Sequence, residues 1–277
     1  MKKLLFTVVL LALVLGSQAQ SFEGIIKWSM AMEITDPATK AKMEEAQKKM
    51  SDPATQAQMK EMQAKMNDPQ FKAMMDSNPQ LKAQMEMAMK AMQSGDLNSL
   101  IPKGFTLEVK NGNTLSKAEG GMMDKMEVLY LKDKKLSYRL DRPNKTYSPL
   151  PVSNDQSHTP QDIKVTKTSE TTKILNYTCS KYVIESTFNG KPTTQILWTT
   201  TEIKDLDLKS LSQQRVGNQQ AIFYDKVDGV PLRIEMIMKE GKMHMEVTSI
   251  KKQALSAAEF AIPPDFKEVP FTMAPGH

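Results

Sequence analysis

Residues 22–34 read FEGIIKWSMAMEI, and this stretch decides the fold class expected of the chain. Apolar side chains alternate with others such as Lys27 and Ser29, and a period of two residues is typical of a β-strand with one buried side. The stretch therefore predicts a strand with one apolar face. That face carries Ile26, Trp28, Met30, Met32 and Ile34.

The same period of two returns from residue 105 onward. Turn residues such as Asn111-Gly112 and Asp228-Gly229 separate the candidate strands, and one helix is expected over 202–215. Apart from that helix, no helix of 10–15 residues lies between successive strands from residue 105 onward, so the pattern predicts an antiparallel meander rather than βαβ units. The candidate strands cover residues 105–110, 113–118, 126–132, 135–141, 145–149, 161–168, 171–178, 180–188, 192–200, 220–227, 231–239 and 242–251.

Residues 36–95 follow a different pattern, which predicts a helical insertion. Asp-Pro recurs at even spacing, at Asp36, Asp52 and Asp68, and the first two units read DPATKAKMEEAQKKMS and DPATQAQMKEMQAKMN. An Asp followed by Pro is a helix start, since the carboxylate caps free N–H groups and Pro suits the first helical position. The chain is thus expected to be α+β and mainly β. Residues 20–35 and 96–277 would form one antiparallel β domain, interrupted by a methionine-rich helical segment.

Residues 1–19 are expected to be a signal peptide. Lys2 and Lys3 precede an apolar run of about 12 residues, which is too short to span a bilayer. Small residues ending at Ala19 suit a signal peptidase. The mature protein is therefore expected in the periplasm or secreted, and no later stretch is apolar enough to make it an integral membrane protein.

The charge of the chain does not favour nucleic-acid binding. The formal net charge of +5 falls to +3 when Lys2 and Lys3 leave with the signal peptide. No block of five basic residues occurs, and aromatic residues make up only 6% of the sequence. We therefore expect no nucleic-acid partner.

The sequence contains none of the common catalytic motifs, such as G-x-S-x-G, the P-loop or H-E-x-x-H. The single cysteine, Cys179, would need a base such as His158 or His244 to act as a nucleophile. A lone cysteine in a candidate strand is more often a small packed residue. The protein is therefore expected not to be an enzyme and to need no cofactor.

The 22 methionines leave two alternatives open. Flexible thioether side chains suit a surface that packs on variable apolar ligands, and we favour this interpretation. Thioethers also select Cu(I), so a copper site at Met59, Met62 and Met66 is the alternative; the same spacing serves any amphipathic helix. The candidate ligand-lining residues are Trp28, Met30, Met32, Met59, Met62, Met66, Met85, Met89, Met92, Met236 and Met238.

Several segments resemble the domain-of-unknown-function 4412 family of exported Gram-negative proteins. The most specific is TKILNYTCSKY at 172–182, followed by Leu-Trp-Thr-Thr at 197–200. Residues 22–26, 229–232 and 260–263 add shorter matches. The resemblance covers about residues 105–266 together with the N-terminal strand.

That family is similar in pattern to the periplasmic lipoprotein-carrier superfamily. The resemblance implies a strongly curved, half-barrel-like antiparallel sheet covered by helices over an apolar cavity. It supplies no catalytic residues. A lipid, a lipoprotein or another envelope component is the partner that it implies.

Overall fold

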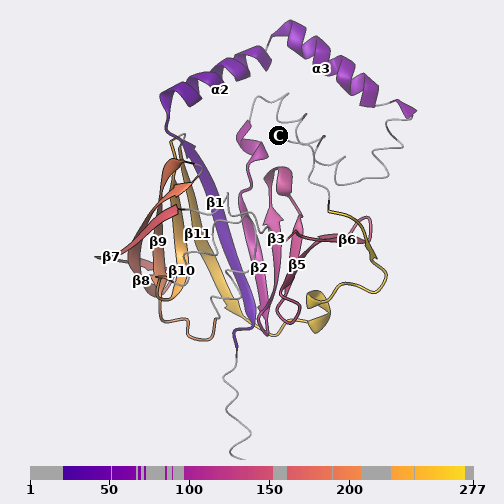
Figure 1. Cartoon of the computed structure of the whole chain (residues 1–277). Coiled ribbons are helices and arrows are strands. Elements are labelled where there is room, and N and C mark those ends of the chain that lie inside the picture. The colour runs from indigo at the N-terminus through magenta and orange to yellow at the C-terminus, as the bar shows by residue number, and fades with distance from the viewer. Residues whose placement is uncertain are drawn as a thin grey trace, which may run out of the picture.

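The computed structural model describes residues 21–50, 52–66, 68–69, 72, 85, 89, 97–151, 161–188, 190–206, 226–239 and 241–271. Within them, twelve strands form one curved sheet (Figure 1). The two edge strands do not pair with each other, so the sheet is open. The expectation of a mainly β, antiparallel fold with an inserted helical segment is confirmed.

The sheet consists of two meanders joined through the N-terminal strand β1 (Gly24–Ile34). On one side of β1, five strands follow in chain order: β2 (Gly104–Lys110), β3 (Asn113–Glu119), β4 (Glu127–Leu131), β5 (Leu136–Asp141) and β6 (Thr146–Pro149). On the other side the order runs backward along the chain: β11 (Gly241–Lys252), β10 (Val230–Ile237), β9 (Lys191–Thr200), β8 (Tyr177–Phe188) and β7 (Gln161–Ile174). The first strand of the fold is therefore central in the sheet.

The register places aromatic and aliphatic residues of the two meanders side by side. Trp28 of β1 pairs with Phe105 of β2 on one side and with Val247 of β11 on the other. A bulge between Lys27 and Trp28 shifts the register against β11. Bulges increase the local twist and bend of a strand, which suits the curvature of the sheet at this point.

The two faces of the sheet support separate hydrophobic clusters. The larger cluster is on the inner face and includes Ile26, Leu107, Leu232 and Val247. The smaller cluster is on the outer face of β3–β5, where Phe260 of the short 3₁₀ helix η5 (Ala257–Phe260) covers it; its other buried members are Leu115, Leu129, Tyr138 and Leu140.

The Asp-Pro repeats begin helices, as predicted. Helix α2 spans Pro37–Met50 and helix α3 spans Pro53–Met66. Asp36 caps α2, because its Oδ2 accepts hydrogen bonds from the Thr39 N–H at 2.8 Å and the Thr39 hydroxyl at 2.7 Å. Asp52 accepts a longer bond from the Ala54 N–H, at 3.4 Å. Figure 1 shows that α2 and α3 continue from β1 beyond the ends of the strands.

Some element boundaries differ from those expected. The predicted strand 161–168 and the first residues of the predicted strand 171–178 form one long strand, β7. The turn to β8, at Leu175 and Asn176, lies within the predicted strand 171–178, whose last two residues begin β8. Leu175 adopts a φ of 54° there, and a Leu-Asn turn lacks the glycine that would have marked it. A bulge between Lys167 and Thr171 occupies the place of the predicted break.

Other predicted elements lie partly outside the described residues. Of the helix expected over 202–215, residues 202–206 are described and are not helical; Ile203 and Leu206 are buried in the inner cluster instead. Of the strand expected over 220–227, only 226–227 are described, and they are not strand. The two-residue strand β12 (Lys267–Glu268) pairs parallel with β6 and was not predicted.

The predicted signal peptide, residues 1–19, lies outside the described residues. Among the residues that the structure describes, the helices are too short or too polar to cross a bilayer.

Candidate functional site

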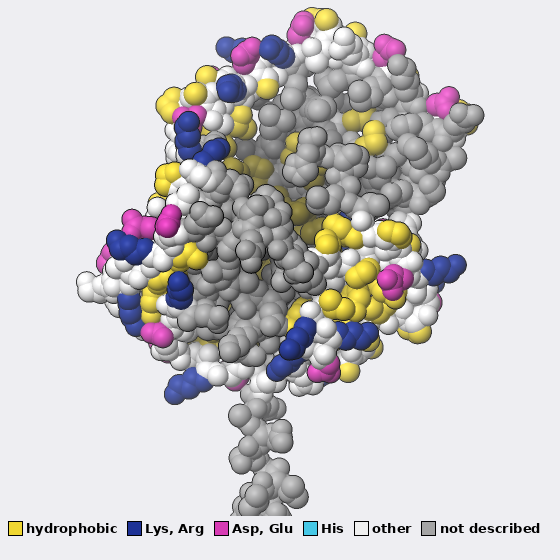
Figure 2. Space-filling model, in the orientation of Figure 1, with side chains coloured by type: hydrophobic (Ala, Val, Ile, Leu, Met, Phe, Trp, Pro, Cys, Tyr) yellow, Lys and Arg dark blue, Asp and Glu magenta, His cyan; other side chains and the backbone are white. Residues whose placement is uncertain are grey.

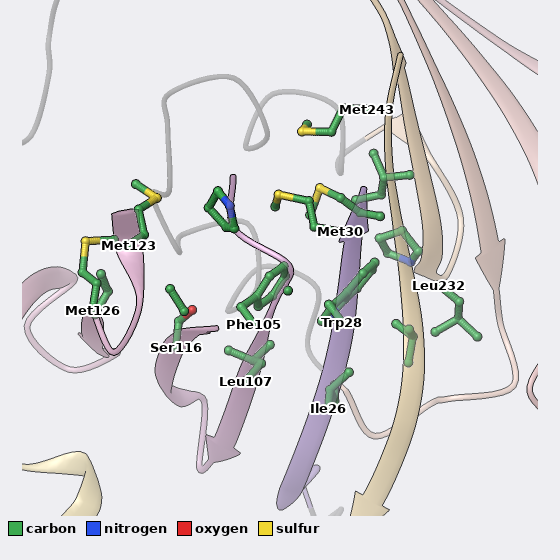
Figure 3. A pocket seen from close by; sticks show the side chains of 18 of the residues that line it. Ile26, Trp28, Met30, Phe105, Leu107, Ser116, Met123, Met126, Leu232 and Met243 are labelled. Atoms are coloured by element: carbon green, nitrogen blue, oxygen red, sulfur yellow. The ribbon is translucent and has the colours of Figure 1, made fainter. Parts of the chain in front are cut away.

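An apolar cavity of about 280 Å³ lies on the inner face of the sheet, between the two meanders (Figure 3). Its walls come from β1, β2 and β3 on one side and from β10 and β11 on the other. Figure 2 shows hydrophobic side chains gathered in the hollow under the helices. The lining residues are Ile26, Trp28, Met30, Pro102, Gly104, Phe105, Leu107, Ser116, Ala118, Met123, Met126, Val128, Val230, Pro231, Leu232, Ile234, Met243, Met245 and Val247.

The centre of the cavity wall is an aromatic pair. The Trp28 and Phe105 rings stack with their centroids 5.6 Å apart and their planes 12° apart. Beside them β1 and β2 approach so closely that a Cβ on Gly104 would collide with the Trp28 carbonyl oxygen. Glycine at this position therefore keeps the two strands, and with them the two rings, in contact.

Methionines surround one end of the cavity. Figure 3 shows the side chains of Met30 and Met243 at that end and those of Met123 and Met126 along one side. They come from β1, from β11 and from the short 3₁₀ helix η2 (Gly121–Met123) with the residues that follow it. Unbranched thioether side chains adapt to irregular apolar shapes, so this end of the cavity can repack around a bound chain.

The lining is almost free of polar groups. Ser116 contributes the one hydroxyl, and no Asp, Glu, Lys, Arg or His belongs to the lining residues that the structure describes. A water molecule in this cavity would find few hydrogen-bond partners. An apolar group, in contrast, would be removed from water here without the burial of an unpaired polar group. The arrangement is chemically suited to binding a hydrocarbon chain.

Two of the predicted site residues, Trp28 and Met30, line the cavity. Met32 lies farther along β1 and is 37% exposed. Met236 is half-buried against the inner cluster and pairs with Met243, while Met238 follows the end of β10 at the turn to β11. None of these three belongs to the cavity lining.

The predicted site residues of the helical insertion are only partly described. Met85 and Met89 are helical and half-buried. The backbone of α3 includes Met59, Met62 and Met66, but their side chains lie outside the described residues, as does Met92 altogether. The copper alternative at Met59, Met62 and Met66 therefore stays a prediction.

Sequence reasoning missed most of the lining. Phe105 and Leu107 alternate inside a predicted strand. Met243 and Met245 alternate in the second strand of a predicted hairpin, where they pair with Met236 and Ile234. The signal for these residues was present as alternation. It did not reveal that β2 and β11 are both neighbours of β1.

The residues considered for catalysis are placed apart from the cavity. Cys179 is 0% exposed within the inner cluster, and burial raises the pKa of its thiol to about 11, so the thiol keeps its proton at neutral pH. His244 alternates with Met243 and Met245 and lies on the outer face, 3.6 Å from Glu246. His158 is outside the described residues. No group of three His, Cys, Asp or Glu side chains in the described part of the chain could hold a metal ion.

Solved structures resemble the chain only distantly. PNGF-II in a C2 crystal form is 17% identical over 61% of this chain, with a TM-score of 0.35, and this chain spans only 28% of PNGF-II. LprF from Mycobacterium bovis is 12% identical over 62% of this chain and 85% of its own, with a TM-score of 0.26. Scores this low support no inference about this chain, and the likeness to lipoprotein carriers stays a prediction.

No curated protein matches the chain at a significant level. The sequence profile of a protein family, in contrast, matches residues 84–266. The match begins in the helical insertion and runs through β2–β11 to the segment that covers the outer face. The resemblance expected from the sequence is thereby confirmed: the chain belongs to the family described as domain of unknown function DUF4412.

Proposed function

We propose that the protein is an exported, non-enzymatic binder that holds the apolar chain of a lipid or another envelope component in the inner cavity. The observation that carries the proposal is the cavity of about 280 Å³ with one hydroxyl as its polar side chain. Binding pockets are typically concave, mostly apolar and supplied with few polar groups. The proposal includes the periplasm or the exterior of the cell as its location, as residues 1–19 predict.

The size of the cavity limits what it can hold. A group the size of a water molecule occupies about 30 Å³, so about nine such groups fill the cavity. A methylene group is of similar size, and burying each one contributes about 0.8 kcal/mol. A chain of about nine carbons would thus gain ~7 kcal/mol before the costs of association. That gain corresponds to micromolar binding at best, which suits a ligand that is taken up and released.

The direct test uses the neutral apolar dye N-phenyl-1-naphthylamine, whose fluorescence rises when it leaves water. The mature chain, starting at Gln20, should bind one dye molecule per chain, and a fatty acid should displace it. Native mass spectrometry of the protein purified from its own host should show an apolar molecule bound. Absence of dye binding, together with a bare protein in the mass spectrum, would contradict the proposal.

A substitution that fills the cavity should weaken dye binding. Ala118 lines the cavity on β3, so Ala118→Phe puts a phenyl ring into the space that the dye would occupy. We expect affinity to fall by at least about tenfold, since an overfilled apolar site accommodates further volume poorly. The measurement is a fluorescence titration at constant protein concentration.

The matched control is Ala31→Phe. Ala31 is exposed on β1, pairs with His244 and alternates with Met30, so its side chain is on the outer face. This variant adds the same ring outside the cavity and should bind the dye normally. An equal loss in both variants, or no loss in Ala118→Phe, would show that the dye binds elsewhere.

A further inference from the structure

The inner face of the sheet changes from apolar to polar beyond Ser116. Strand pairing sets Ser116 of β3 beside Val128 of β4, and Val128 in turn beside Arg139 of β5. Arg139 pairs with Ser148 of β6. Ser116 and Val128 line the cavity, so Arg139 and Ser148 continue the same row on the same face, just beyond the cavity wall.

A second polar row runs parallel to the first, two residues farther along each strand. Thr114 pairs with Tyr130, and Tyr130 pairs with Ser137. All three are buried, with exposed fractions of 0% for Thr114, 2% for Tyr130 and 8% for Ser137. Pairing alone therefore places several hydroxyl groups inside the molecule beside an apolar cavity.

Hydrogen bonds within the described part of the protein do not satisfy every polar group of these two rows, and Thr114 is the example. Its Oγ1 is buried and has no hydrogen-bond partner among the described residues. Burying a hydroxyl without a hydrogen-bond partner is unfavourable, and most buried polar side chains have such a partner. A bound molecule with oxygen atoms would remove it.

The residues on the opposite face of β3 and β4 agree that Thr114, Ser116 and Val128 point inward. Leu115 and Leu129 alternate with Thr114, Ser116 and Val128, and they pack in the outer cluster under Phe260. Leucine side chains thus point outward on β3 and β4, and the hydroxyl-bearing ones point inward. This is the reverse of the pattern that a sheet with a purely apolar inner face would need.

We propose that the ligand is a single-chain amphiphile with an acidic head. This inference rests on the proposed function: the hydrocarbon chain occupies the cavity, and the head lies against the polar rows of β3–β6. Hydroxyl groups of Ser116 and Thr114 donate hydrogen bonds to the head. Arg139 is the one cationic position in these two rows, and a guanidinium group matches a carboxylate in charge and geometry.

The test compares three ligands of equal chain length by calorimetry on the whole mature chain, starting at Gln20. Decanoate, decanol and decyltrimethylammonium differ only in their heads. We expect decanoate to bind at least about tenfold more tightly than decanol, because a hydrogen bond to a charged group contributes more than one between neutral groups. The cationic ligand should bind most weakly.

Arg139→Gln should lower decanoate affinity by about tenfold and leave decanol affinity unchanged. Arg142→Gln is the matched control, because Arg142 lies in the turn after β5 and pairs with Glu127 at 2.6 Å. It should change neither affinity. Thr114→Val keeps the side-chain shape, removes the unpaired hydroxyl and should weaken decanoate binding without lowering the melting temperature.

The outcomes separate this inference from the proposed function. Equal affinities for decanoate and decanol, unchanged by Arg139→Gln and Thr114→Val, would overturn the acidic head and leave the apolar cavity site intact. Failure of all three ligands and of the neutral dye would overturn the proposed function. If Arg139→Gln does not fold, Thr114→Val and the ligand series decide the result on their own.

Discussion

Replacing Trp28 with alanine is expected to lower the free energy of unfolding by about 3–5 kcal/mol, the usual cost of deleting a large buried aromatic side chain. Trp28 is 9% exposed, stacks on Phe105 and pairs with strands of both meanders. Its removal leaves a void at the one strand that joins the two halves of the sheet. Denaturant unfolding followed by circular dichroism measures the loss.

Trp198→Ala is the control, since the chain has only these two tryptophans. Trp198 is half-buried. The Lys181 Nζ lies 5.7 Å from the centre of its ring, and the central carbon of the Arg233 guanidinium lies 6.0 Å from it. This variant should lose less stability than Trp28→Ala. If the alanine variant of Trp28 does not fold, Trp28→Phe should fold and lose a smaller amount. Equal losses of stability in the two alanine variants would show that the contact of Trp28 with both meanders adds nothing to the stability of the fold.

Trp28 also shows how far the sequence predicts the site. Alternation along residues 22–34 places Trp28 and Met30 on a buried face, and both line the cavity. Alternation assigns a side chain to a face but does not name the neighbouring strands. The pairing of β1 with β2 and β11 depends on contacts between residues far apart in the sequence, and these contacts create the cavity.

The methionines illustrate a different limit. Spacing at Met59, Met62 and Met66 predicts an apolar helix face, and the same spacing arises whether that face meets a core, a ligand or a metal ion. The lining methionines that the structure describes belong instead to strands, as Met243 does, and to the segment around η2, where Met123 and Met126 stand out by no spacing of their own. Composition therefore indicated the chemistry of the cavity better than its location.

The turn at Leu175 marks a third limit, which concerns boundaries. Turn prediction relies on residues that tolerate a positive φ, such as Gly or Asn, whereas here Leu175 adopts a φ of 54°. The long pairing of β7 with β8 outweighs the local strain. Local propensity instead placed a break inside β7, at Ser169 and Glu170, and continued a strand through Leu175.

The stability of the protein is expected to fall between pH 9 and pH 11 because of Cys179. Burial raises the pKa of its thiol from 9.0 to about 11. Below pH 9 the thiol is protonated in the folded and the unfolded chain, and the contribution to stability is fully present. Above pH 9 the unfolded chain releases the proton that the folded chain retains, so unfolding is favoured by about 1.4 kcal/mol for each pH unit.

Because lysines and tyrosines titrate in the same range, the comparison with Cys179→Ala isolates this effect. The variant loses some packing at every pH, but its stability should fall less steeply from pH 9 to pH 11, by a total of about 3 kcal/mol. The folded natural chain should also resist alkylation by iodoacetamide at pH 8, since Cys179 is 0% exposed, and should react once unfolded. The same pH dependence of stability in the natural chain and in Cys179→Ala, or fast alkylation of the folded chain, would mean that the thiol reaches solvent. A nucleophilic role for Cys179 would then have to be reconsidered.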